Sequence, residues 1–380
     1  LFILMGMILE KTNIAENLLK AMNQIYNNTS GGYAISVVLV GALMGASTGI
    51  VGASVVTLGL LSLPVMIKNN YPKHLTCGVI CASGTLGQII PPSLVLILLA
   101  DVLSSAYQQA QLNMGIFSPE TVTIAELFAG AVIPGIVLPI LYIIYIKIFH
   151  KNLKVASSTE DKLNLTKSFL PPILLIFLVL GSIILGIATP SEAASLGVFG
   201  ALLISLIQKQ LNVNILNNCS KETIKLTSMI FLILIGATLF SLVFRGLNEE
   251  EAIQSIFLDD SVDKFYTLLI VLLLMFLLGF ILDFIEIIFI VIPIFGPILF
   301  TLGFDPVWIG ILIGMILQTS FLTPPFGFSI FYLRGVAPDD IDTRDIYKGV
   351  LPFVFIQLFV VVLILLIPNL ATLLPSIILS

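Results

Sequence analysis

Apolar residues run along the 380-residue chain in stretches of about twenty, separated by short polar segments that hold most of the charge. An apolar helix of about 20 residues crosses roughly 30 Å of hydrocarbon, and open sheets would leave backbone groups unpaired in lipid. The pattern therefore predicts a polytopic membrane protein whose spans are all helical. The expected membrane segments are 1–9, 33–66, 74–100, 126–148, 169–187, 191–207, 227–245, 265–300, 307–333 and 350–376.

Two of these segments do not have the length of an ordinary span. At a rise of 1.5 Å per residue, 33–66 and 265–300 are each too long to cross the bilayer once and too short to cross it twice comfortably. Each is therefore predicted to be a re-entrant helical hairpin, which returns to the side from which it entered.

The composition excludes an ordinary soluble domain. Apolar residues make up 58% of the chain and charged residues only 10%, against roughly 25% charged in soluble proteins. The apolar run at the start lacks an initiator methionine and is too short to span alone, so it is interpreted as the remainder of a first helix. The cysteines form no CxxC pair, so no disulfide framework is expected. Only two histidines could join the cysteines as ligands, so no metal site other than one for Na⁺ is expected.

Basic residues fall almost entirely on one side of the predicted membrane. If the hairpins return and the other segments cross, all of the 17 Lys and Arg residues except Arg245 and Lys264 lie in loops on a single side. The positive-inside rule makes that side cytoplasmic. The opposite side receives the loops at 101–125 and 245–264.

An internal repeat underlies this topology. Pro64, Pro72, Pro91 and Pro92 recur as Pro297, Pro306, Pro324 and Pro325, at offsets of 233, 234, 233 and 233. Each copy contains a hairpin, a short loop and a long segment interrupted by Pro-Pro, and the charge distribution gives the copies opposite orientations. The predicted fold class is an all-α polytopic membrane protein with an inverted-topology repeat, two re-entrant helical hairpins and two Pro-Pro-broken helices, an arrangement typical of transporters.

Each Pro-Pro pair interrupts a helix at mid-membrane depth. Because proline removes a donor and clashes with the preceding turn, at about 3 kcal/mol each, neither 84–93 nor 318–327 can be a continuous helix. Freed carbonyls and nearby hydroxyls are oxygen ligands for a small cation; the alternative is a kink supported by Ser and Thr side chains. The residues expected at the breaks or lining the substrate are Gly87, Pro91, Pro92, Ser93, Glu286, Pro324, Pro325 and Gly327.

The expected tips of the two hairpins differ in chemistry. The first, at 45–54, consists of small residues, which suit either close helix packing or the lining of an ion or substrate site. The second contains Asp283 and Glu286, the only acidic pair deep in an apolar run. A charge at the bilayer centre costs about 2.5–3.5 kcal/mol, which favours a role as cation ligand or polar lining over a solvated tip.

A third polar motif, Thr189-Pro190-Ser191-Glu192, is interpreted as structural. Threonine as N-cap, proline at the first helical position and glutamate reaching back predict a capping box at a helix start.

Five motifs resemble those of the large membrane subunit of tripartite ATP-independent periplasmic (TRAP) transporters: GASTGIVGAS, CASGTLGQIIPPS, IATPSEAA, GFILDFIEI and QTSFLTPPFGFSIFYLRGVAP. The resemblance covers essentially the whole chain. It implies a Na⁺-driven importer of organic anions in the bacterial cytoplasmic (inner) membrane, with a small membrane subunit and an extracytoplasmic solute-binding protein as partners. It also implies that the hairpins and broken helices move like an elevator against a scaffold, with Na⁺ as coupling ion and no other cofactor.

The resemblance also assigns residues. It places Na⁺ sites at Ser47, Thr48, Gly49, Ser83, Gly84 and Thr85 in one half and at Asp283, Thr319, Ser320 and Thr323 in the other, with substrate between the hairpin tips. The first tip has Ala-Ser-Thr where a Ser-Gly-Ser type of sequence is usual, so the ligand roles of Ser47 and Thr48 stay open. The segment DVLSSAYQQAQ and the second-hairpin variant resemble the α-keto acid, lactate and mannitol/chloroaromatic subgroup, which implies a monocarboxylate or keto acid.

The expected organisation has five parts: a truncated N-terminal helix and cytoplasmic loop (1–32), the first transport-domain half (33–100), an outer loop with scaffold helices (101–264), the second half (265–333), and a cytoplasmic loop with a C-terminal membrane helix (334–380). The alternative function is a stand-alone Na⁺/organic anion symporter that needs no binding protein. No nucleic-acid partner is expected. An intramembrane enzyme is not expected either, because the chain has no HExxH motif and no pair of catalytic aspartates on separate spans.

Overall fold

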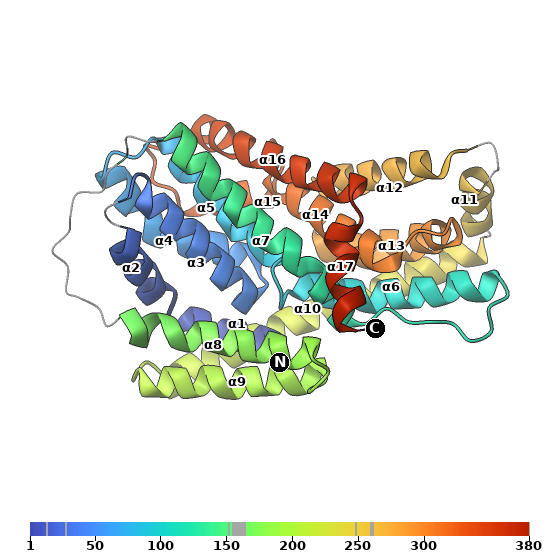
Figure 1. Ribbon diagram of the computed structural model, residues 1–380, viewed down its shortest axis with the longest axis horizontal. Helices are drawn as coiled ribbons and strands as arrows, with labels where there is room; N and C mark the ends of the chain where they lie inside the picture. The colour runs from blue at the N-terminus through green and yellow to red at the C-terminus, as the bar shows by residue number, and fades with distance from the viewer. Residues whose placement is uncertain are drawn as a thin grey trace.

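Every regular element in the described part of the computed structural model is a helix (Figure 1). The structure describes residues 1–12, 14–26, 29–150, 153, 165–247, 249–258 and 262–379, and within these the side chains of 15, 47, 48, 165–169 and 249–252 are not described. Among the described helices, six are long and apolar enough to cross a bilayer. The predicted all-helical fold is confirmed.

Two helical hairpins point toward each other from opposite ends of the molecule. The first is α3 (Gly32–Thr48) with α4 (Val51–Lys68), and the second is α12 (Lys264–Leu278) with α13 (Phe284–Thr301). Their open ends lie at the left and right of Figure 1, so their tips meet near the middle. The first tip turns within two residues because Gly49 adopts φ +61°, where a side chain would be strained. The predicted hairpins and their opposite orientations are confirmed.

Each hairpin is followed by a helix that breaks at Pro-Pro. The first broken helix consists of α5 (Lys73–Thr85), the short 3₁₀-helix η1 (Leu86–Gln88) and α6 (Leu94–Asn113). The second consists of α14 (Pro306–Leu322) and α15 (Phe328–Val336). The Pro91-Pro92 and Pro324-Pro325 peptide bonds are both cis. Both interruptions therefore lie where the sequence predicts them.

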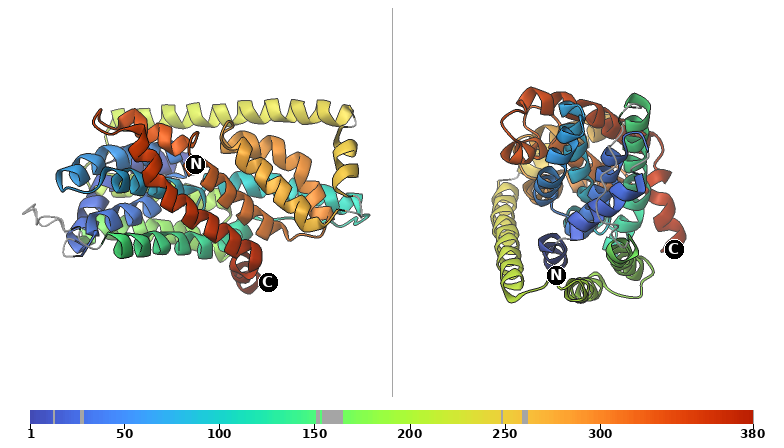
Figure 2. Two further views of the ribbon diagram at one scale, coloured as in Figure 1. Left: turned by 90° about the horizontal axis from the view of Figure 1, so that it is seen from above. Right: turned by 90° about the vertical axis from the view of Figure 1, so that its left-hand side faces the viewer.

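A layer of helices lies along one side of the hairpins and broken helices. It consists of α1 (Phe2–Lys11), α8 (Leu165–Ile184), α9 (Pro190–Ile207) and the long α10 (Val213–Gly246), which leads into α11 (Glu249–Phe257). Figure 2 shows α10 running along the edge of the bundle, and α10 contacts both α1 and α13. We call α1, α8, α9 and α10 the scaffold layer.

Three further helices join the halves: α7 (Ile124–Phe149), α16 (Thr343–Leu366) and α17 (Asn369–Ile378). Helix α16 packs along α5, and α7 contacts α3, α14, α16 and α17. The expected last span, 350–376, is thus two helices, because Pro368 cannot continue the hydrogen bonding of α16.

Two expected loops are partly helical. Helix α2 (Ile14–Tyr26) occupies the expected cytoplasmic loop 10–32, where Ile14, Leu18 and Met22 form a buried face at helical spacing. Helix α10 begins at Val213, well before the expected span at 227–245. In both cases polar residues on the outer face of the helix interrupt the apolar run, so apolar length alone does not predict the helix.

Several helices begin with hydrogen-bonded caps. At α9 the Thr189 hydroxyl accepts from the Glu192 backbone N–H while Glu192 accepts from that of Thr189, which confirms the predicted capping box. The same arrangement begins α7 at Thr123 and Glu126.

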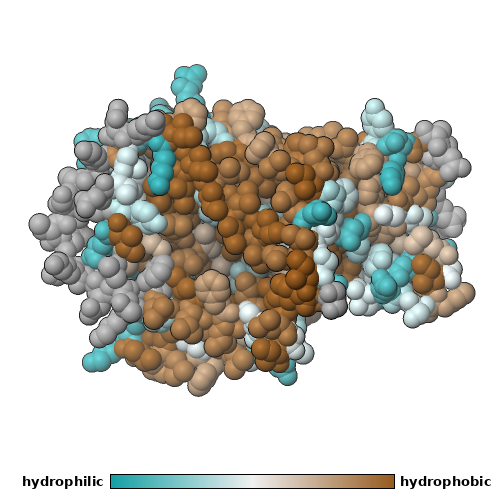
Figure 3. All heavy atoms as spheres, in the orientation of Figure 1, coloured by the Kyte–Doolittle hydropathy of each residue, from teal (hydrophilic) through white to brown (hydrophobic). Residues whose placement is uncertain are grey.

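The outer surface suits lipid over much of its length. Figure 3 shows apolar residues covering the broad middle of this face, with polar residues toward both ends. Exposed apolar side chains come from several helices, including Ile136 of α7, Phe177 of α8 and Phe355 of α16. At the left-hand end, Lys73 forms an ion pair with Asp340 at 3.2 Å, so the basic loops of the two repeats meet there.

Glycines allow the first hairpin to clamp the first helix break. A Cβ atom added at Gly45 would lie 2.5 Å from the backbone N and Cα of Gly87. On the other arm, a Cβ atom added at Gly84 would lie 2.3 Å from Cγ2 of Val55. The end of α5 therefore lies between α3 and α4 at backbone contact.

We expect Gly45→Ala to destabilise the protein, because the new methyl group would collide with backbone rather than with a movable side chain. Overpacking of this kind costs about 1–3 kcal/mol, and the thermal unfolding midpoint in detergent should fall. Gly236→Ala is the matched control: it lies in α10 with no atom within 4 Å of the added Cβ, so the higher helix propensity of alanine should leave the midpoint unchanged or raised. Equal midpoints for the two variants would refute the clamp.

Candidate functional site

A cavity of about 110 Å³ lies where the two hairpin tips meet the scaffold layer. We call it the tip cavity. The first hairpin contributes Ile50, Val51 and Gly52, the second contributes Asp283, Phe284 and Ile285, and the scaffold layer contributes Ile3, Leu226, Met229 and Ile230; Leu94, Phe321 and Tyr332 complete the wall. The cavity therefore joins both repeats and the scaffold layer.

Asp283 is the one carboxylate among the described residues that line the tip cavity. It is the N-cap of α13: its Oδ1 accepts from the Phe284 backbone N–H at 2.8 Å, and Glu286 Oε2 accepts from the Asp283 backbone N–H at 3.2 Å. The start of a helix stabilises a carboxylate through these donors and through the helix dipole. Glu286 thus turns back to cap the helix, while Asp283 lines the cavity.

The second tip rests directly on the end of α14. A Cβ atom at Gly279 would lie 2.2 Å from Oγ of Ser320, so only glycine permits this approach. The hydroxyls of Thr319, Ser320 and Thr323 donate to the carbonyls of Met315, Leu317 and Thr319 at 2.7–2.8 Å. These bonds support the kink, as the structural alternative required, and they leave the hydroxyl lone pairs able to coordinate a cation.

The first half has a comparable arrangement. A Cβ atom at Gly49 would lie 2.9 Å from the backbone N of Leu94, which places the first tip on the N-terminus of α6. Thr85 donates to the carbonyl of Ala82 at 2.9 Å, and Ser93 donates to that of Gln88 at 2.7 Å. The buried Ser83 hydroxyl has no hydrogen-bond partner among the described residues. The predicted ligand side chains of Ser47 and Thr48 lie outside the described part.

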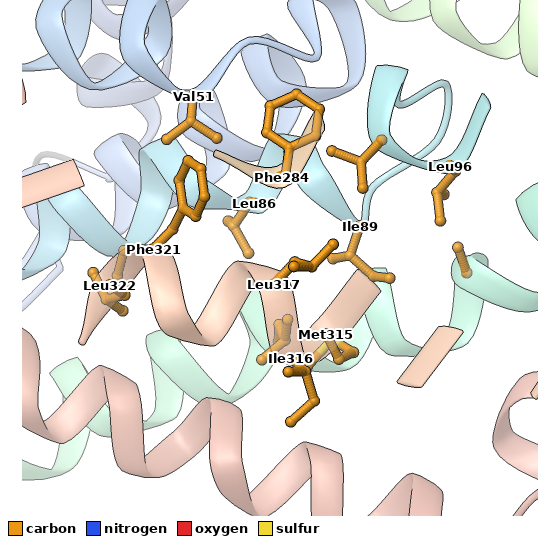
Figure 4. Close-up of a cluster of buried hydrophobic side chains, with 14 of the residues drawn as sticks. Val51, Leu86, Ile89, Leu96, Phe284, Met315, Ile316, Leu317, Phe321 and Leu322 are labelled. Carbon is orange, nitrogen blue, oxygen red and sulfur yellow. The ribbon is translucent and has the colours of Figure 1, made fainter. Parts of the chain in front are cut away.

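An apolar wall lies between the two tips and the helix breaks. Figure 4 shows Val51, Phe284 and Phe321 beside one another, with Leu86 and Leu317 behind them. The rings of Phe284 and Phe321 have centroids 6.0 Å apart. The wall packs the two tips against the end of α14 and the start of the first break, whereas Pro325 and Phe326 of the second break are exposed.

The residues expected at the breaks do not line the tip cavity. Gly87 contacts Gly45, and Gly327 begins α15. Pro91 lines a separate apolar cavity of about 340 Å³ between α3, α7 and α8. The carbonyl of Pro325 accepts a hydrogen bond from the Tyr347 hydroxyl at 3.2 Å. Pro92, Ser93, Pro324 and Glu286 are likewise absent from the tip-cavity wall.

Sequence reasoning missed part of the wall. Residues 50–52 lay within the small-residue motif but had no assigned role, and Tyr332 lay in the final motif; a Cβ atom at Gly52 would lie 2.9 Å from its ring. Ile3 and the α10 residues are ordinary apolar residues of apolar helices. Only the folded arrangement brings them to the tips.

A buried amide network connects the first break to two other helices. Gln357 of α16 donates from Nε2 to the hydroxyl of Tyr142 on α7 at 2.8 Å and to that of Thr85 at 3.4 Å. Gln318 of α14 lies beside the same Tyr142 hydroxyl. All four residues are fully buried. Thr85, a predicted ion ligand, is thus held in place by a residue that no motif indicated.

The oxygen groups around the tip cavity suit a light cation. Its described lining contains one carboxylate and no lysine or arginine. No group of three His, Cys, Asp or Glu side chains that could hold a metal occurs among the described residues. Hydroxyl, carbonyl and carboxylate oxygens near the tips are hard ligands, which suit a light cation and not a transition metal.

Two inverted halves, two helical hairpins and a cavity where the hairpin tips meet are typical of a multi-pass membrane transporter. Residues 1–370 match the family described as "Tripartite ATP-independent periplasmic transporter, DctM component". The chain therefore belongs to the family of TRAP transporter large membrane subunits, which confirms the predicted resemblance. Members of this family are inner-membrane proteins that work with a small membrane subunit and a solute-binding protein, as predicted.

Individual relatives and a solved structure agree with this assignment. The C4-dicarboxylate TRAP transporter large permease DctM of Pseudomonas aeruginosa is 27% identical over 99% of this chain and 84% of its own length. The sialic acid TRAP transporter large permease SiaM of Vibrio cholerae is 25% identical over 100% of this chain and 86% of its own. The Alcanivorax borkumensis YdaH transporter, whose crystal structure is described as having an unusual topology, shares the fold with a TM-score of 0.65, 15% identity and coverage of 96% and 84%.

We expect Gln357→Leu to lower both stability and transport. The substitution removes one of the two amides beside the buried Tyr142 hydroxyl, which costs about 1–3 kcal/mol, and it removes the bond to Thr85. The measurements are the thermal midpoint and the initial rate of substrate uptake in proteoliposomes. Phe359→Leu, at an exposed position on the same helix, should change neither, and a Gln357→Leu variant with normal uptake would contradict a role for the network at the first break.

Proposed function

We propose that this chain imports a small organic acid, delivered by an extracytoplasmic solute-binding protein, with Na⁺ as coupling ion. The substrate class is a monocarboxylate or keto acid. The observation that carries the proposal is the tip cavity, where Asp283 and the two hairpin tips face the scaffold layer.

Coupling to Na⁺ is supported by the charge of the site. An organic anion entering the tip cavity meets a carboxylate and no cationic side chain among the described lining residues. Burying two negative groups together is costly unless a cation accompanies them. Na⁺ held by oxygens at the tips supplies that charge, so substrate and ion bind together.

The substrate class is supported by the walls of the cavity and by the motif variants around Asp283. The lining is mainly aliphatic and aromatic, with Asp283 and the Tyr332 hydroxyl as polar groups. This suits a small acid with a short apolar part. Relatives are named for substrates as different as C4-dicarboxylates and sialic acid, so membership of the family alone does not select the class.

Movement is supported by the composition of the cavity wall. One side belongs to hairpins and broken helices held together through glycine contacts, and the other belongs to α1 and α10. A sliding displacement of the first group along the second carries the tip cavity across the membrane without opening the clamps at the breaks. This is the elevator-like mechanism that we propose.

Uptake by purified protein tests delivery by the binding protein. We expect the large and small subunits in proteoliposomes to accumulate radiolabelled organic acid only when an inward Na⁺ gradient and the loaded solute-binding protein are both present. Uptake of free acid at the same rate without that protein would instead establish the stand-alone symporter.

We expect Asp283→Asn to weaken the dependence on Na⁺. Asparagine keeps the N-cap of α13 but removes the charge, so the Na⁺ concentration for half-maximal uptake should rise on the order of tenfold. Asp263→Asn, at the N-cap of α12 and outside the tip cavity, is the control and should leave the Na⁺ curve unchanged. An unchanged curve for Asp283→Asn would exclude Asp283 as a ligand.

A further inference from the structure

The end of the molecule opposite the basic loops carries a second, larger cavity. It has a volume of about 510 Å³ and lies between the end of α6 with its following loop and the turn from α13 to α14. These elements lie at the right in Figure 1, and the positive-inside rule makes this end extracytoplasmic. We call it the outer cavity.

The outer cavity is acidic. Its described lining includes Glu120 and Asp305 and no lysine or arginine, and Lys264 Nζ lies beside it, 5.7 Å from the ring centroid of the lining residue Phe304. Both residues are exposed, and Asp305 caps α14 by accepting from the Trp308 backbone N–H at 2.8 Å. Two carboxylates at one opening attract a cationic group and repel anionic lipid headgroups.

The loop that carries Glu120 is fixed in place. Gln111 of α6, which is 4% exposed, donates from Nε2 to the Glu120 carbonyl at 3.0 Å, and its Oε1 accepts from the Glu120 backbone N–H at 2.9 Å. Tyr107 and Phe300 meet edge to face, with ring centroids 5.3 Å apart, and form the inner wall. The cavity is therefore a built feature of the fold.

The same loop presents apolar side chains beside the acidic opening. Phe117 is 92% exposed, the highest value among the exposed large hydrophobic residues, and Met114 and Ile116 are 46% and 44% exposed. Exposed aromatic side chains next to a charged pocket are typical of protein interfaces, where aromatic residues and arginine supply most of the binding energy.

We propose that the outer cavity and the 114–117 segment form a docking surface for the solute-binding protein. A lysine or arginine of that protein enters between Glu120 and Asp305, and an apolar patch on it covers Phe117. The inference rests on the proposed delivery of substrate by a binding protein. The acidic opening disfavours anionic lipid headgroups, and the exposed apolar residues beside it fit a protein surface.

The position of the surface links docking to the substrate site. Helix α13 begins at Asp283 in the tip cavity and ends at Thr301, next to the lining residues Phe300 and Gly303 of the outer cavity. Its 18 residues, which include Pro293 and Pro297, correspond to about 27 Å of helix. Binding of a protein at the outer end of the second hairpin therefore acts on the helix whose other end closes the substrate site.

The test is the concentration of loaded solute-binding protein that gives half-maximal uptake by the complete membrane complex in proteoliposomes. Glu120→Gln combined with Asp305→Asn should raise this concentration on the order of tenfold, with the maximal rate retained because asparagine still caps α14. Phe117→Ser alone should raise it in the same direction. Asp263→Asn is the matched control, since Asp263 caps α12 at the same end by accepting from the Phe265 N–H at 2.8 Å, and it should have no effect.

Three outcomes overturn the proposal. In the first, the half-saturating concentration is the same for the double variant and the control. In the second, only the maximal rate falls. In the third, the effect disappears when anionic lipid is replaced by neutral lipid. In each of these, uptake that still requires the binding protein leaves the proposed function intact. Uptake that needs no binding protein overturns both.

Discussion

The architecture depends on satisfying backbone groups that two Pro-Pro pairs release in the middle of a membrane. Such groups cannot remain unpaired in lipid. Ser93 donates to the carbonyl of Gln88, and Ser329 donates to that of Phe321 at 2.8 Å, so each break carries its own hydroxyl cap. Gly45 and Gly279 then allow a hairpin to cover each break at contact distance. The hairpin tips are consequently fixed at mid-depth, where the tip cavity forms.

The two halves use one geometry for different purposes. The first tip has no ionisable residue and closes on the start of α6, whereas the second carries Asp283 at a helix N-terminus. The charge is held by backbone donors in place of a buried cationic partner, so it stays available to a mobile ion. Placing the acid on α13 also connects it to the acidic end of the molecule, where we propose that the delivering protein docks.

The sequence was sufficient for the elements that follow from length and proline position. Two overlong apolar segments and four prolines at matching offsets predicted both hairpins, both breaks and their opposite orientation. Only part of the tip-cavity wall could be predicted. Asp283 stood out as a charge in an apolar run, whereas Ile3 and Ile230 are ordinary apolar residues of apolar scaffold helices. Gln357 could not be found either: it is a single polar residue in an apolar span, and its importance comes from the Tyr142 and Thr85 hydroxyls that folding brings beside it.

The most direct test of the account is a cross-link between the moving and the static wall of the tip cavity. Ile230→Cys on α10 and Ile285→Cys on α13 would be combined after replacing the three native cysteines, which are all buried. We predict that a mercury bridge between the two cysteines abolishes uptake, and that an excess of dithiothreitol, which competes for the mercury and removes it, restores uptake, because the second hairpin must slide past α10 to carry substrate. Uptake at the normal rate by fully cross-linked protein would contradict the account.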